Sequence, residues 1–135
     1  MRVNSFFHPV TFDSDIASVD TSYNTARKHT VTLGSFPAGS SFIGQLQQIT
    51  IFVSSIASSA ANMSLKITKD AAGNKTLTDF SGGAFTIGQT ATTGSVTFVP
   101  EYPIYVPGGD TVYIWYKVNT GTCTVDSDSH LIWKE

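Results

Sequence analysis

The feature that most constrains this chain is the alternation of apolar and polar side chains in short runs. Residues 111–118 show it most clearly, because Val112, Ile114 and Tyr116 fall on one face and Lys117 on the other. Successive side chains of a strand point to opposite faces of a sheet, so a period of two predicts a half-buried β-strand. Comparable runs occur at residues 28–33, 42–54, 63–68, 76–80, 95–99, 122–125 and 130–134.

Residues typical of turns separate these runs. Gly, Pro, Asn and Asp cluster at residues 36–40, 70–74, 108–110 and 119–121, where they favour tight connections. About eight strands divided in this way predict an all-β fold, an antiparallel two-sheet β-sandwich or jelly roll. A parallel sheet would need helical crossovers, and the sequence offers no place for them.

The composition agrees with one β domain. The chain has 135 residues, 41% of them hydrophobic and only 13% charged, enough for one core of ordinary size. Ser and Thr make up roughly a quarter of the chain and supply the missing polar surface. We expect a single domain over residues 26–135, preceded by a segment of different character over residues 1–25.

Residues 1–25 fit neither a strand nor a helix for long. Phe6, Phe7 and Phe12 are spaced irregularly among polar side chains. Two interpretations stay open: an extended arm whose aromatic rings dock on another surface, and an irregular first strand packed on the chain's own core.

Charge and hydropathy exclude several partners. The net charge is −2, and the eight Lys and Arg residues are scattered, whereas a nucleic-acid binder needs a basic face. No apolar run approaches the length of a membrane span. The first residues lack the apolar stretch of a signal peptide, so we expect synthesis in a cytoplasm without export by that route.

No catalytic, metal or cofactor motif can be assembled from the sequence. The single cysteine, Cys123, fits a small buried hydrophobe better than a nucleophile. Two Asp-Ser-Asp triplets, residues 13–15 and 126–128, lack the glycine and distal glutamate of a calcium loop. The three histidines share no metal-ligand spacing. We therefore expect no enzyme activity, no metal and no cofactor.

Tyr113 and Trp115 share the second face of the strongest predicted strand. They are candidate partner-binding residues, as a stacking platform for sugars or as an oligomer contact. The alternative is that both faces of this strand are covered, one by the opposite sheet and one by a loop, because a second apolar face is usually buried.

Three stretches together resemble a known class of protein: residues 46–55, residues 63–74, and residues 110–122 continuing through 125–135. Their order is similar to small β-sandwich structural proteins of tailed bacteriophages, particularly capsid decoration (cement) proteins. The resemblance covers about residues 42–135.

This resemblance implies a non-enzymatic virion protein that binds the outside of a phage head and reinforces it. It implies the major capsid protein lattice as partner, a homo-oligomer (trimer or dimer), and a place on the capsid exterior. Phe6, Phe7 and Phe12 would then be hydrophobic anchors. Because phage fibres and spikes reuse similar sandwiches, a carbohydrate- or receptor-binding module of a tail fibre is the alternative. Its sugar platforms would be Tyr102, Tyr105, Tyr113 or Trp115.

Overall fold

The described residues of the computed structural model are 7–12, 14–33, 43–57, 59–88, 90–107 and 109–134, and they contain strands but no helix. The strands are β1 (Phe7–Thr11), β2 (Ile16–Val19), β3 (Lys28–Thr32), β4 (Ile43–Ala57), β5 (Asn62–Thr68), β6 (Thr76–Ala84), β7 (Thr86–Ile87), β8 (Gly94–Phe98), β9 (Tyr105–Pro107), β10 (Thr111–Val118), β11 (Thr122–Val125) and β12 (His130–Lys134).

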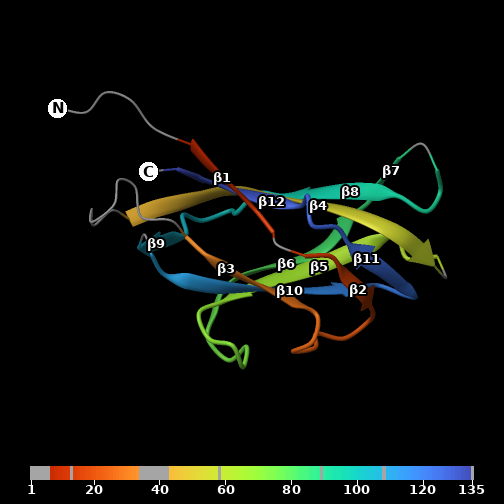
Figure 1. Cartoon of the computed structure of the whole chain (residues 1–135), viewed down its shortest axis with the longest axis horizontal. Helices are drawn as coiled ribbons and strands as arrows, with labels where there is room; N and C mark the ends of the chain where they lie inside the picture. The colour runs from red at the N-terminus through yellow and green to blue at the C-terminus, as the bar shows by residue number, and fades with distance from the viewer. Residues whose placement is uncertain are drawn as a thin grey trace.

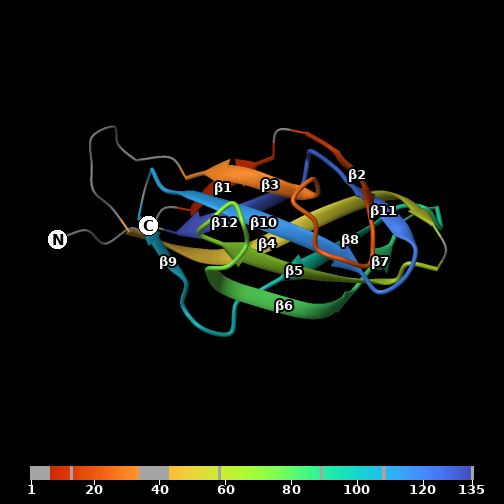
Figure 2. The same cartoon turned by 90° about the horizontal axis from the view of Figure 1, so that it is seen from below.

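Two antiparallel sheets face each other (Figure 1). The four-stranded sheet has the order β3-β10-β5-β6, which Figure 2 shows from its outer side. The eight-stranded sheet has the order β1-β12-β4-β11-β2, with β8 and β9 also paired to β4 and β7 paired to β8. The predicted all-β, two-sheet antiparallel sandwich is confirmed, while the jelly-roll form stays a prediction.

β4 is the spine of the eight-stranded sheet. This fifteen-residue strand pairs with β12 and β11 along one edge and with β9 and β8 along the other. Its apolar pattern changes phase between Leu46 and Ile49, and the structure has a register shift at this place, where Trp133 faces Leu46 but Ile132 faces Gln48. The extra residue is a β-bulge, which restores the inward direction of the apolar side chains.

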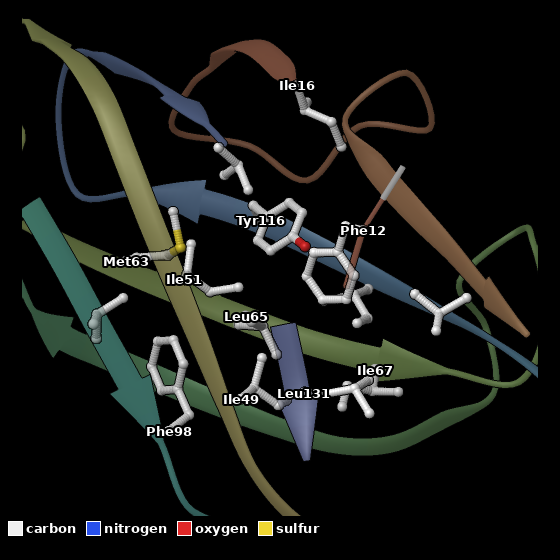
Figure 3. Packing of buried hydrophobic residues seen from close by; sticks show 14 of the residues in the cluster. Phe12, Ile16, Ile49, Ile51, Met63, Leu65, Ile67, Phe98, Tyr116 and Leu131 are labelled. Atoms are coloured by element: carbon white, nitrogen blue, oxygen red, sulfur yellow. The ribbon is translucent and has the colours of Figure 1, made fainter. Parts of the chain in front are cut away.

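The core lies between the two sheets. Ile49, Ile51, Leu65 and Leu131 are at most 1% exposed, and Figure 3 shows them interleaved with Phe12, Phe98 and Tyr116. Each such side chain contributes about 1.5–3 kcal/mol when it is fully buried. Two packed layers therefore form a rigid body without a disulfide.

The N-terminal segment takes part in this body from residue 7 onward. β1 pairs with β12, and β2 pairs with β11 across a register shift. Ser18, inside that shift, has φ 58°, a left-handed conformation that is uncommon outside glycine. Short strands of this kind (β1, β2, β7 and β9) explain why the described residues form twelve strands and not the expected eight.

Candidate interaction surfaces

The predicted N-terminal anchors differ in their placement. Phe12 is 5% exposed and packs against the ring of His29, with 4.6 Å between ring centroids. Its ring belongs to the core, so it is not exposed to a partner. Phe7 begins β1 with its backbone opposite Lys134. The side chain of Phe7 and all of Phe6 lie outside the described residues.

Trp115 is covered by the domain's own hairpin. The indole is 3% exposed, and its Nε1 donates a hydrogen bond to Thr68 Oγ1 at 3.0 Å. The β5–β6 connection passes over the ring so closely that a Cβ on Gly73 would lie 2.8 Å from Trp115 Cζ2. Gly73 also has φ +83°, so this turn needs glycine for two reasons. Trp115 is therefore not an open stacking platform.

Trp115 is instead the centre of a row that crosses all four strands of its sheet. The strand registers place Lys28 of β3 and Lys66 of β5 on either side of Trp115, and Asp79 of β6 beyond Lys66. Tyr113, which is half-buried, lies next to the row with its ring centroid 5.8 Å from Lys28 Nζ.

Ammonium groups and aromatic rings alternate along this row. Lys28 Nζ lies 5.0 Å from the Trp115 ring centroid, and Lys66 Nζ lies 4.8 Å from the centroids of both Trp115 and Tyr23. Lys117 Nζ is 4.8 Å from Tyr23. Each contact is a cation–π interaction worth about 0.5–1 kcal/mol near the surface. We call Lys28, Lys66 and Lys117, with Trp115 and Tyr23 between them, the lysine row.

Tyr23 stays protonated over an unusually wide pH range. Burial and, second, the negative charge of Asp79 raise the pKa of its hydroxyl to about 12. The ring between Lys66 and Lys117 is therefore a neutral phenol at neutral pH. Tyr23 comes from the β2–β3 connection, where no periodicity in the sequence pointed to it.

A second surface lies at the open edge of the sandwich, between β6 and the β8–β9 connection (Figure 2). Here a groove of about 600 Å³ separates the two sheets. Phe80 and Phe98 contact each other at 5.1 Å between centroids and form part of its wall. We call it the edge groove; its other lining residues are Leu77, Thr78, Asp79, Ser81, Gly83, Thr97, Val99, Glu101, Tyr102 and Ile104.

Large apolar side chains are exposed at the edge groove. Val99 and Tyr102 line it and are 63% and 75% exposed, and Tyr105, in the adjoining strand β9, is 60% exposed. The sequence marked Tyr102 and Tyr105 only by the prolines around them. Val99 was missed because it ends the alternating run 95–99, and the pattern alone does not show whether the last residue of such a run is buried.

Buried polar groups in the core serve the fold. The Nε2–H of His29 donates to the carbonyl of Ser14 at 2.7 Å, because a carbonyl oxygen can only accept. In the neutral ring, Nδ1 then accepts from the Tyr116 hydroxyl at 2.8 Å. Burial and, second, the charge of Asp126 raise the pKa of the Cys123 thiol to about 12, which leaves no thiolate nucleophile at neutral pH.

Within the described ranges, no group of three or more His, Cys, Asp or Glu side chains could hold a metal ion. Asp79 and Glu101 are the two carboxylates that line the edge groove. In the same part of the chain, no helix has the length and hydropathy to cross a bilayer.

Comparison with known proteins returned no match. No family model, no curated protein and no solved structure matches this chain.

Proposed function

We propose that this chain is a non-enzymatic structural protein that attaches to the surface of a protein assembly through its edge groove. The observation that carries the proposal is the exposure of Val99 and Tyr102 in the edge groove, with the exposed Tyr105 three residues further along the chain from Tyr102. Exposed apolar groups that are gathered in one place mark interaction sites on soluble proteins, whereas scattered ones do not. Tyrosine is also among the residues that most often dominate binding energy.

The assembly we propose is the major capsid protein lattice of a tailed bacteriophage, with this chain as a decoration or cement protein on the capsid exterior. The resemblance of residues 42–135 to such proteins supports the assignment. A rigid sandwich suits it because little conformational entropy is lost on binding. As a trimer or dimer, the protein would engage several lattice sites at once, and linked weak contacts give stable attachment.

The test replaces two exposed tyrosines, Tyr102 in the edge groove and Tyr105 in the adjoining strand β9. We expect Tyr102→Ala with Tyr105→Ala to weaken binding to undecorated capsids by at least 2 kcal/mol, about thirtyfold, if either ring acts as a hot spot. Cosedimentation of the purified protein with capsids measures this. Ile87→Ala is the matched control, because Ile87 is 50% exposed on β7 and is not among the residues that line the groove.

Equal binding by the tyrosine variant and the wild type would contradict the role of the groove. A chain that lacks residues 1–6 tests the proposed N-terminal anchor in the same assay. This truncation leaves β1 complete, since the strand begins at Phe7. Loss of capsid binding by the truncated chain alone would assign the attachment to the arm.

A second candidate is a carbohydrate- or receptor-binding module of a tail fibre. Two exposed tyrosines beside Glu101 favour it, since sugars stack on aromatic rings and their hydroxyls donate to carboxylates. Binding on a glycan array that Tyr102→Ala abolishes would support this module. Quantitative mass spectrometry of purified virions separates the two, because hundreds of copies indicate capsid decoration and a few indicate a fibre.

A further inference from the structure

The lysine row gives an acidic chain one locally basic face. The net charge is −2, yet three of the eight Lys and Arg residues gather on the outer side of the four-stranded sheet. We propose that this face binds an acidic protein segment, one that carries several Asp or Glu side chains, through Lys28, Lys66 and Lys117. None of the three lysines lines the edge groove, although Asp79 borders both surfaces, and binding at the lysine row does not require capsid binding.

The spacing of the charges argues for an anionic partner. Neighbouring ammonium groups share a ring and lie within 5.0 Å of its centroid. They are therefore at most about 10 Å apart, which is about one Debye length at 0.1 M salt. Like charges at this separation repel each other. Several carboxylates laid across the row would relieve that repulsion at every lysine.

The ammonium groups are also held in place before a partner arrives. Lys28 Nζ donates to the carbonyl of Thr25 at 3.1 Å, and Lys66 Nζ donates to the carbonyl of Gly73 at 3.3 Å. Together with the aromatic contacts, these bonds fix side chains that are otherwise flexible. An ordered lysine loses less side-chain entropy on binding, so the entropy that opposes ion-pair formation is smaller.

The chemistry of the row favours carboxylates over sugars and nucleic acid. Sugars need an open ring face, but Lys66 lies against both Tyr23 and Trp115, and the hairpin at Gly73 covers Trp115. A phosphate backbone favours the forked guanidinium of arginine and a wide basic field. The cations of this row are lysines, and the negative charge of Asp79 lies at its end. The net charge of −2 also repels a polyanion such as nucleic acid.

The experiment measures binding of a short fluorescent poly-L-glutamate peptide to the full chain at low ionic strength by anisotropy. We expect Lys66→Gln with Lys117→Gln to weaken binding about threefold to tenfold, because two charge pairs near the surface are lost. Lys69→Gln with Lys75→Gln removes the same charge outside the row and should leave affinity nearly unchanged. Glutamine keeps most of the aliphatic stem that packs on the rings.

The variant Lys66→Arg with Lys117→Arg keeps both positive charges, so we expect it to retain binding. Retained binding by this variant supports the proposal even if the glutamine variant folds poorly. Equal losses in the two glutamine variants would overturn it, since net charge alone would then explain the binding. Absence of poly-L-glutamate binding by the wild type would also overturn it. Tighter binding to an oligothymidylate than to poly-L-glutamate would overturn it in favour of a nucleic-acid ligand.

Discussion

The buried histidine of β3 is held by two hydrogen bonds, and the carbonyl of Ser14 fixes the direction of one of them. Ser14 offers only a carbonyl oxygen to Nε2, and the Tyr116 hydroxyl lies at Nδ1. These two hydrogen bonds join the β1–β2 connection to β3 and β10, and the tilted ring of Phe12 packs against the imidazole. One imidazole thus connects the N-terminal segment to the four-stranded sheet.

We expect Tyr116→Phe to lower the free energy of unfolding by about 1–2 kcal/mol, because a buried acceptor loses its donor without a change in packing volume. Urea denaturation monitored by fluorescence measures it. Tyr105→Phe is the matched control, because the hydroxyl of this 60% exposed residue is accessible to water in either state. A similar shift in both variants would contradict the role of the His29 contact.

At the scale of elements, close approach between β4 and β12 depends on a glycine. The indole of Trp133 lies against Gly44, where an added Cβ would overlap the ring atoms Nε1, Cδ1 and Cε2. Trp133 is 3% exposed, and its Nε1 has no hydrogen-bond partner among the residues that the structure describes. The ring is packed tightly against β4 and has little room to move.

Gly44→Ala should destabilise the protein by about 1–3 kcal/mol, the usual cost of overpacking a core. Denaturant midpoints give the value, and adding Trp133→Leu to the same chain should recover part of it because the smaller side chain makes room for the methyl group. If the two changes are instead strictly additive, the overlap between residue 44 and the indole is not the cause.

Elements with clear alternation could be predicted, and those shaped by distant pairing could not. β10, β5 and β12 follow the sequence pattern, and so does the bulge in β4. β2 and the three-residue β9 have no comparable alternation in the sequence. Their strand conformation comes from pairing with β11 and β4, which are distant in the sequence. The surfaces behave likewise: the edge groove joins residues from both sheets, and Tyr23 reaches the lysine row from a connection.

At the scale of the whole molecule, several weak acids are buried in their neutral form. Burial raises the pKa of Tyr116 well above its usual value of 10.0, while the pKa of Cys123 rises from 9.0 and that of Tyr23 from 10.0, each to about 12. The folded chain therefore retains protons that the unfolded chain releases in alkaline solution. Proton release then favours unfolding.

We expect stability to be independent of these groups below pH 9.0 and to fall from there up to about pH 12. A raised pKa in the folded state contributes its stability at low pH and loses it as pH rises, which sets the sign. Urea unfolding at a series of alkaline pH values measures the slope. We expect Cys123→Ala to reduce the fall in the free energy of unfolding at the lower end of this pH range. An unchanged slope would show that the thiol does not contribute to it.

The order of strands in the larger sheet has a consequence for biosynthesis. Among the described strands, β1 is made first and β12 last, yet β12 lies between β4 and β1 in the sheet. β1 therefore has no pairing partner in the sheet until β12 has been made. Until then β1 stays unpaired in the nascent chain. A premature stop codon before residue 130 would remove β12 and would also leave β1 without its partner in the sheet.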